Sequence, residues 1–95
     1  MNTYELLFIL NPDLSAAEAK NKLDDVSAVA LDLGGEIEVR NNWEKQQLAY
    51  EVDGFQEGLI YILGLELEPG EVATLRRRLN TDEDILRIVL LREDS

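Results

Sequence analysis

Residues 4–10 read YELLFIL and are followed at once by Asn-Pro-Asp at residues 11–13. Seven residues suit a strand better than a helix, and the Asn-Pro-Asp sequence is typical of a turn. Both alternating faces of the stretch are largely apolar, since only Glu5 interrupts them. Residues 4–10 therefore predict a central strand of a sheet, with neighbours on both sides.

A helix is expected directly after this turn. Ser15 is a good N-cap, and Glu18 three residues later completes a capping box. Apolar residues then recur every three or four positions, as one stripe of a helix of about five turns: Ala19, Leu23, Val26, Ala30 and Leu33. Gly34-Gly35 ends the helix, because glycine adopts the left-handed cap without a Cβ penalty.

The remaining chain repeats this order of elements. Residues 36–40 alternate charged and apolar side chains, as a half-buried strand does, and residues 48–52 alternate in the opposite phase. A bulge or a break is therefore expected across residues 41–47. We expect a loop at residues 53–58, a third strand at 59–67, a short helix from Pro69 to about Asn80, and a last strand at 85–92.

This order predicts one α+β domain over residues 1–95, a ferredoxin-like βαββαβ sandwich. Right-handed crossovers give it a four-stranded antiparallel sheet with both helices on one face. Whichever face the helices cover, apolar side chains remain on the other: either the side of Phe8, Leu63 and Leu65, or the side of Leu7, Ile9, Ile60 and Ile62. Such a patch marks an interaction surface. The alternative is that loops or the second-strand hairpin fold over it.

Composition excludes several classes of function. The chain has 95 residues, 45% of them hydrophobic, with 20 acidic and 9 basic residues and a net charge of -11. This balance argues against binding to nucleic acid or to an anionic membrane by bulk charge. No histidine or cysteine is present, which removes thiol chemistry, disulfides and ordinary zinc sites. No apolar run approaches the ~20 residues that span a bilayer.

Catalysis is not expected. Paired carboxylates occur at Asp24-Asp25, at Glu36 with Glu38 and at Asp82-Glu83-Asp84, but chance alone brings acids together in so acidic a chain. They lie on expected solvent faces or loops, which lack the burial that shifts a carboxylate pKa to the range useful for catalysis. The last group also lacks the glycine and distal glutamate of a calcium loop. No enzyme activity, metal, cofactor or small-molecule substrate is therefore expected.

Several residues could contact RNA or a protein partner. The run Arg76-Arg77-Arg78 points in directions about 100° apart, and a solvated face near a helix C-terminus is the alternative. Arg87 interrupts the apolar last strand and needs an RNA phosphate, a partner's carboxylate or a neighbouring glutamate. An aromatic residue beside basic and amide residues is typical of an RNA-contacting surface, as at Trp43, Lys45, Gln46 and Gln47. For Trp43 the alternative is packing on the rim of the core.

Four stretches resemble one family, the sixth small-subunit ribosomal protein of bacteria (the S6 family). They are Tyr4-Glu5 with the turn at Asn11-Pro12-Asp13-Leu14, the junction Gly34-Gly35-Glu36-Ile37, the segment WEKQQLAY at residues 43–50, and Asp82 to Arg87. They occur in the family's order and spacing from Tyr4 to about Arg92. Glu44 stands where the family has glycine, and Gln46 where it has arginine.

The resemblance implies the ferredoxin-like fold and a structural role in the small subunit of the cytoplasmic ribosome. It implies binding to the central domain of small-subunit rRNA together with a small basic protein, S18, so that an acidic protein meets a basic one and the pair meets RNA. Lys45 and Arg87 match the family pattern, as do Tyr4 and Tyr50, for which packing is the alternative. The candidate RNA- or partner-binding residues are Tyr4, Trp43, Lys45, Gln46, Tyr50, Arg76, Arg77 and Arg87.

A second interpretation stays open. The same apolar face could be buried in a homodimer of a stand-alone ferredoxin-like module that serves regulation or binds a small ligand. Native mass distinguishes the two, because the ribosomal protein is expected to be a monomer when pure.

Overall fold

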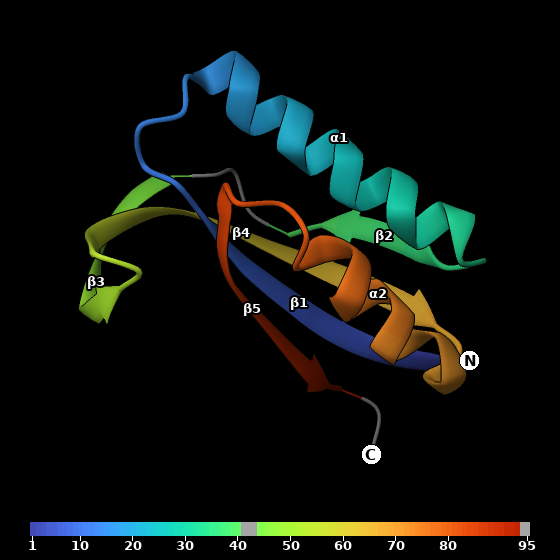
Figure 1. Cartoon of the computed structure of the whole chain (residues 1–95). Helices are drawn as coiled ribbons and strands as arrows, with labels where there is room; N and C mark the ends of the chain where they lie inside the picture. Colours follow the sequence, from blue (N-terminus) through green and yellow to red (C-terminus); the bar gives the residue numbers. More distant parts are fainter. Residues whose placement is uncertain (41–43, 94–95) are drawn as a thin grey trace.

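The structure, a computed structural model, describes residues 1–40 and 44–93, without the side chain of Glu44. Its elements are β1 (Asn2–Leu10), α1 (Ala16–Asp32), β2 (Glu36–Val39), β3 (Glu44–Val52), β4 (Phe55–Leu67), the short 3-10 helix η1 (Pro69–Glu71), α2 (Val72–Leu79) and β5 (Ile85–Arg92). The strands form one antiparallel sheet in the order β2-β4-β1-β5, with β3 also paired to β4. Both helices pack on one face (Figure 1). The expected sandwich is confirmed.

Local signals set the bounds of α1. The Ser15 hydroxyl accepts a hydrogen bond from the Glu18 N–H at 3.1 Å, and the Glu18 carboxylate accepts one from the Ser15 N–H at 2.9 Å, which is the expected capping box. The helix ends before Gly34, whose φ of 82° lies in the left-handed region that favours glycine. Gly35 then passes so close to β4 that an added Cβ would lie 2.5 Å from the Glu66 carbonyl oxygen.

Among the described residues the sheet has five strands, where the sequence predicted four. Strand β4 is 13 residues long, and two shorter strands pair with it end to end. The residues of β2 pair with Leu63–Glu66, and the start of β3 pairs with Glu57–Ile60. Of the segment where a bulge or break was expected, residues 44–47 are paired with β4, and residues 41–43 lie outside the described part of the chain. The odd-numbered residues of β2 and of the start of β3 stand opposite the same face of β4, so the even-numbered Leu48 and Tyr50 belong to the other face.

The prediction of a loop at residues 53–58 is wrong. Only Asp53 and Gly54 form a turn, with φ values of 50° and 85°. Two successive residues of positive φ match the tight hairpin turn that Asp-Gly favours, and its twist suits the flanking strands. Phe55 to Gly58 therefore belong to β4, which becomes long enough to carry β3 beside it.

The core lies between the helices and one face of the sheet. Tyr4, Leu6, Phe8 and Leu10 of β1 point to this face together with Leu59, Tyr61, Leu63, Leu65 and Leu67 of β4. Phe8 and Tyr61 stack with ring centroids 5.2 Å apart. Burial raises the pKa of the Tyr61 hydroxyl. From the helices come Ala19, Val26, Ala30, Leu75 and Leu79. This choice of face, which the sequence left undecided, puts Leu7, Ile9, Ile60 and Ile62 on the opposite, open face.

Candidate RNA and partner interface

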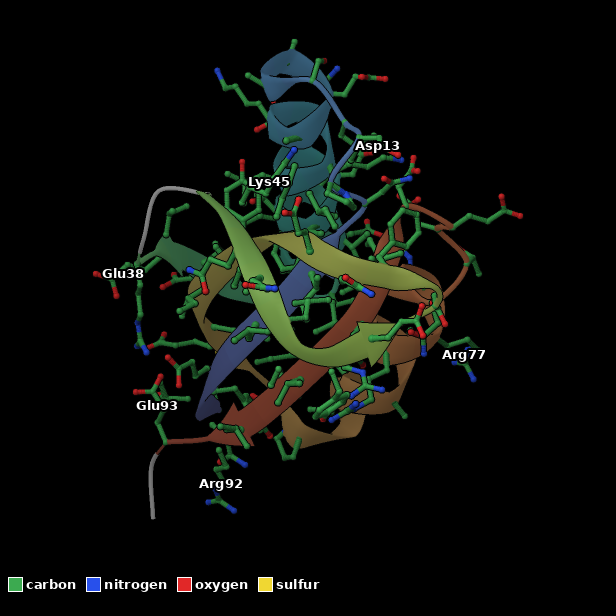
Figure 2. All side chains as sticks on the ribbon, turned by 90° about the vertical axis from the view of Figure 1, so that its left-hand side faces the viewer. Asp13, Glu38, Lys45, Arg77, Arg92 and Glu93 are labelled. Carbon is green, nitrogen blue, oxygen red and sulfur yellow. The ribbon has the colours of Figure 1, made fainter. Side chains whose placement is uncertain are left out.

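The hairpin of β3 and β4 bends across the open face of the sheet. Pairing runs from Glu44↔Ile60 to Gln47↔Glu57 and resumes only at Val52↔Phe55. Residues 48–51 of β3 therefore stand opposite Gln56 alone, which makes a large bulge of four residues against one. Bulges bend a strand and increase its twist. Figure 2 shows the result, with β3 passing in front of the rest of the sheet.

The bulge brings Tyr50 to Arg87. The Arg87 guanidinium carbon lies 5.9 Å from the centre of the Tyr50 ring, within the range of a cation–π contact. The Arg87 Nη1 also donates a long hydrogen bond of 3.4 Å to the Tyr50 hydroxyl. Both side chains are exposed, Tyr50 by 67%. Two of the residues predicted to bind RNA or a partner thus form one aromatic–cation pair on the open face.

A hollow of about 200 Å³ lies beside this pair, between the bulge and the sheet. Ile9 of β1 and Val89 of β5 line it from the sheet, and the hairpin contributes Leu48, Ala49 and Val52. Ile9 is only 7% exposed although the helices cover the other face. The sequence left open whether the hairpin folds over the open face, and the structure shows that it covers Ile9. Leu7, Ile60 and Ile62 on the same face are half-buried.

The other predicted residues of the hairpin point in different directions. Gln46 pairs with Gly58, so it shares the open face with Ile60. Lys45 pairs with Leu59 and lies on the opposite side, where it is exposed (Figure 2). Lys45 is thus separated by the strand itself from Tyr50 and Arg87. Trp43 lies outside the described residues.

Tyr4 is placed in the core. Its side chain is 7% exposed and belongs to the cluster under the helices, and its hydroxyl accepts a hydrogen bond from Asn2 Nδ2 at 3.2 Å. The structure thus gives Tyr4 the packing role that the sequence left as the alternative, and it does not bring Tyr4 to the open face.

The three arginines of α2 are exposed but lie away from the hairpin, because α2 packs on the opposite face of the sheet (Figures 1 and 2). Arg78 pairs with Asp32 of α1 at 2.7 Å, and Arg77 donates to the Thr74 hydroxyl at 3.3 Å. They stand in the last turn of α2, where positive charge favours the helix dipole. Arg76 and Arg77 therefore form a second basic site, on the other side of the sheet from Arg87.

Arg40 is a charged residue of the open face that the sequence did not single out. Its backbone N–H donates to the Ile62 carbonyl at 2.9 Å, and its guanidinium lies over Gly64. There it donates to Glu93, which follows β5, and it also pairs with Glu38 at 3.9 Å. The hydrogen bond to Glu93 raises the pKa of Arg40. A glycine inside an apolar strand signals such a close approach, and Gly64 was that signal.

The basic residues divide into paired and unpaired groups. Lys22, Arg40 and Arg78 form ion pairs with carboxylates of the chain. Lys45, Arg76, Arg77 and Arg87 form none within residues 1–40 and 44–93, and neither does Lys20 of α1. The first four cations, all predicted to bind RNA or a partner, are thus available to an external anion.

Neither a metal-holding cluster nor a membrane-spanning helix occurs among the described residues. No group of three acidic residues there is arranged to hold a metal ion. No helix of the described residues is long and apolar enough to cross a bilayer.

Comparison with known proteins gives one consistent family. The family described as ribosomal protein S6 matches residues 3–92. Among curated relatives, the small ribosomal subunit protein bS6 of Streptomyces coelicolor is 33% identical over 94 residues, covering 99% of this chain and 98% of the relative. That of Saccharopolyspora erythraea is 38% identical over 92 residues, covering 97% and 78%. In structure, the 30S ribosomal protein S6 of Thermotoga maritima has a TM-score of 0.84 at 22% identity, covering 97% of this chain and 87% of that one.

Proposed function

Because this chain belongs to the ribosomal protein S6 family, and is thus a non-enzymatic structural protein of the small ribosomal subunit, we propose that it binds the central domain of small-subunit rRNA together with the basic protein S18. Its place of action is the cytoplasmic ribosome. Its mechanism is assembly: docking to S18, followed by phosphate contacts from a few cations.

The observation that carries this proposal is the pairing pattern of the basic residues. A cation that already has a carboxylate partner gains little from a phosphate, because one favourable contact replaces another. Lys45, Arg76, Arg77 and Arg87 have no such partner among the described residues. Phosphate contacts from Arg and Lys position a protein on nucleic acid, and four cations suffice for a modest contribution.

The net charge of -11 supports a basic partner. Carboxylates surround Arg40 on the open face: Glu5 and Glu38 are near it, and Glu93 is paired with it. Such a surface attracts a basic protein and repels RNA. Bound S18 would therefore compensate the charge that keeps this chain from binding RNA alone.

The test is a binding titration on a central-domain rRNA fragment, with and without S18, at two salt concentrations. We expect tight binding only with S18 present. The variant Arg87→Gln should weaken the complex several-fold and lower the salt slope by about 1, because one phosphate contact is lost. Lys20→Gln on α1, an exposed cation that was not predicted to bind, is the matched control and should leave the slope unchanged.

Two outcomes contradict the proposal. One is the absence of RNA binding even with S18 present, combined with a dimeric native mass, which favours the stand-alone module. The other is an equal effect of Arg87→Gln and Lys20→Gln, which would show that only total charge matters.

A further inference from the structure

The hollow under the hairpin differs in charge from two other hollows of the described residues. Its lining contains Arg87 and Tyr50 and no carboxylate. A hollow of about 220 Å³ next to Arg40 is lined by Glu36, Glu38 and Glu66, and a third contains Glu57. In a chain with 20 acidic residues, a hollow with a guanidinium and no carboxylate in its lining repels an anion less than these two hollows do.

Size and lining limit the ligand further. Sites for whole drug-sized ligands measure roughly 300–1,000 Å³, so about 200 Å³ accepts a single flat ring system. Ile9, Val89, Leu48 and Val52 give it apolar walls, and the exposed Tyr50 ring offers a stacking surface at its edge. Arg87 has five N–H donors, and its long bond to Tyr50 uses one. A ring that carries a phosphate combines all these requirements.

We propose that the hollow holds the base of one unpaired nucleotide of the RNA, stacked on Tyr50, while Arg87 binds its phosphate. This inference rests on the proposed function and names the RNA element that the open face recognises. The base is expected to be unpaired, because a base inside a duplex enters the hollow only at the cost of unpairing and unstacking. Stacking on an aromatic ring tolerates any base, so the site selects an exposed nucleotide more than a sequence.

An apolar side chain of a protein partner is the competing occupant. It would fill the same walls but would leave Arg87 at the edge without an anion. A basic partner would in addition bring positive charge toward Arg87. The charge of the hollow therefore favours the nucleotide.

The experiment uses the full chain with S18 and the central-domain rRNA fragment. Ala49→Leu fills the hollow without changing charge, and Tyr50→Leu removes the stacking ring; both residues are exposed. We expect each to weaken RNA binding by about tenfold, whereas Tyr50→Phe stays near wild type. Chemical probing of the RNA should show one unpaired base protected by the wild type and reactive with Ala49→Leu. Ala28→Leu, at an exposed position of α1, is the matched control.

The outcomes separate the two proposals. If the wild type binds no RNA even with S18, the proposed function fails. If it binds RNA but Ala49→Leu and Tyr50→Leu leave affinity and protection unchanged, the hollow is not a nucleotide site and only this inference fails. If Ala49→Leu weakens binding to S18 in the absence of RNA, the hollow accepts a protein side chain and the inference is overturned. Thermal unfolding of each variant confirms that it is folded, and Tyr50→Leu remains informative if Ala49→Leu is not.

Discussion

Tyr50 and Arg87 meet on the open face although 37 positions separate them, with the guanidinium carbon 5.9 Å from the ring centre. Strand β3 neighbours β4, while β5 lies at the far edge of the sheet. Only the bulge at residues 48–51, opposite Gln56, carries Tyr50 over β1 to reach β5. The contact between Tyr50 and Arg87 therefore depends on the geometry of the hairpin, and it places an aromatic ring and a cation side by side on the open face.

This pair should contribute little to folding. Both side chains are exposed, and an exposed cation–π contact stabilises by about 0.5–1 kcal/mol. We expect Tyr50→Leu and Arg87→Gln each to lower the free energy of unfolding by about 1 kcal/mol or less, with a coupling energy of similar size in a double-mutant cycle. Urea unfolding measures all four proteins. A coupling above about 2 kcal/mol would mean that the pair is structural, and RNA-binding effects could not then be assigned to contact.

Local signals made most of the fold predictable. Three features depend only on residues close in sequence: the capping box at Ser15, the glycines at 34–35 and the two-sided apolar strand. The structure that each of them forms could therefore be predicted from the sequence. The width of the bulge and the choice of core face depend on contacts between distant segments. The sequence therefore suggested Tyr50 and Arg87 separately but could not pair them, and it treated Arg40 as an ordinary strand residue.

The passage of Gly35 beside β4 should be the most sensitive backbone position. An added Cβ would lie 2.5 Å from the Glu66 carbonyl oxygen and 3.2 Å from that of Ala30. Both are backbone atoms within hydrogen-bonded elements, so neither can move cheaply. We expect Gly35→Ala to cost about 1–3 kcal/mol by urea unfolding. Gly70→Ala is the control, because nothing lies within 4 Å of the added Cβ. Equal stabilities of the two variants would contradict the close packing.

Gly64 should respond differently from Gly35. A Cβ there would meet the Arg40 guanidinium at 2.7 Å, which is the far end of a flexible side chain. We expect Gly64→Ala to displace Arg40 from Glu93 at a smaller cost than that of Gly35→Ala. In an Arg40→Ala background the same substitution should carry no penalty, because the obstructing group is gone. A penalty that persists in that background would place the strain in the backbone of β4.

Lys22 connects α1 to the turn before β5. Its Nζ lies 2.8 Å from Asp82 and 3.3 Å from Asp84, and the hydrogen bond to Asp82 raises the pKa of Lys22. We expect Lys22→Met to cost about 1 kcal/mol at neutral pH. A raised pKa gives stability that is complete below the ordinary lysine pKa of 10.5 and is lost as pH rises through the raised value. The difference in unfolding free energy between wild type and variant should therefore vanish in strong alkali. A difference that persists there would mean that packing of the lysine stem, and not its charge, stabilises the contact.

The capping box of α1 should respond to acid in the opposite sense. The Ser15 backbone N–H, followed by the Ser15 hydroxyl, lowers the pKa of Glu18 below 4.5. A lowered pKa gives stability that is present above the ordinary value and is lost as pH falls through the lowered one. Glu18→Gln should therefore differ from wild type near neutral pH and converge with it in acid. An NMR titration of Glu18 in Ser15→Ala checks the cause: because the backbone N–H remains, the pKa should rise only part of the way toward 4.5. A full return to 4.5 would mean that the hydroxyl, and not the backbone, holds the carboxylate.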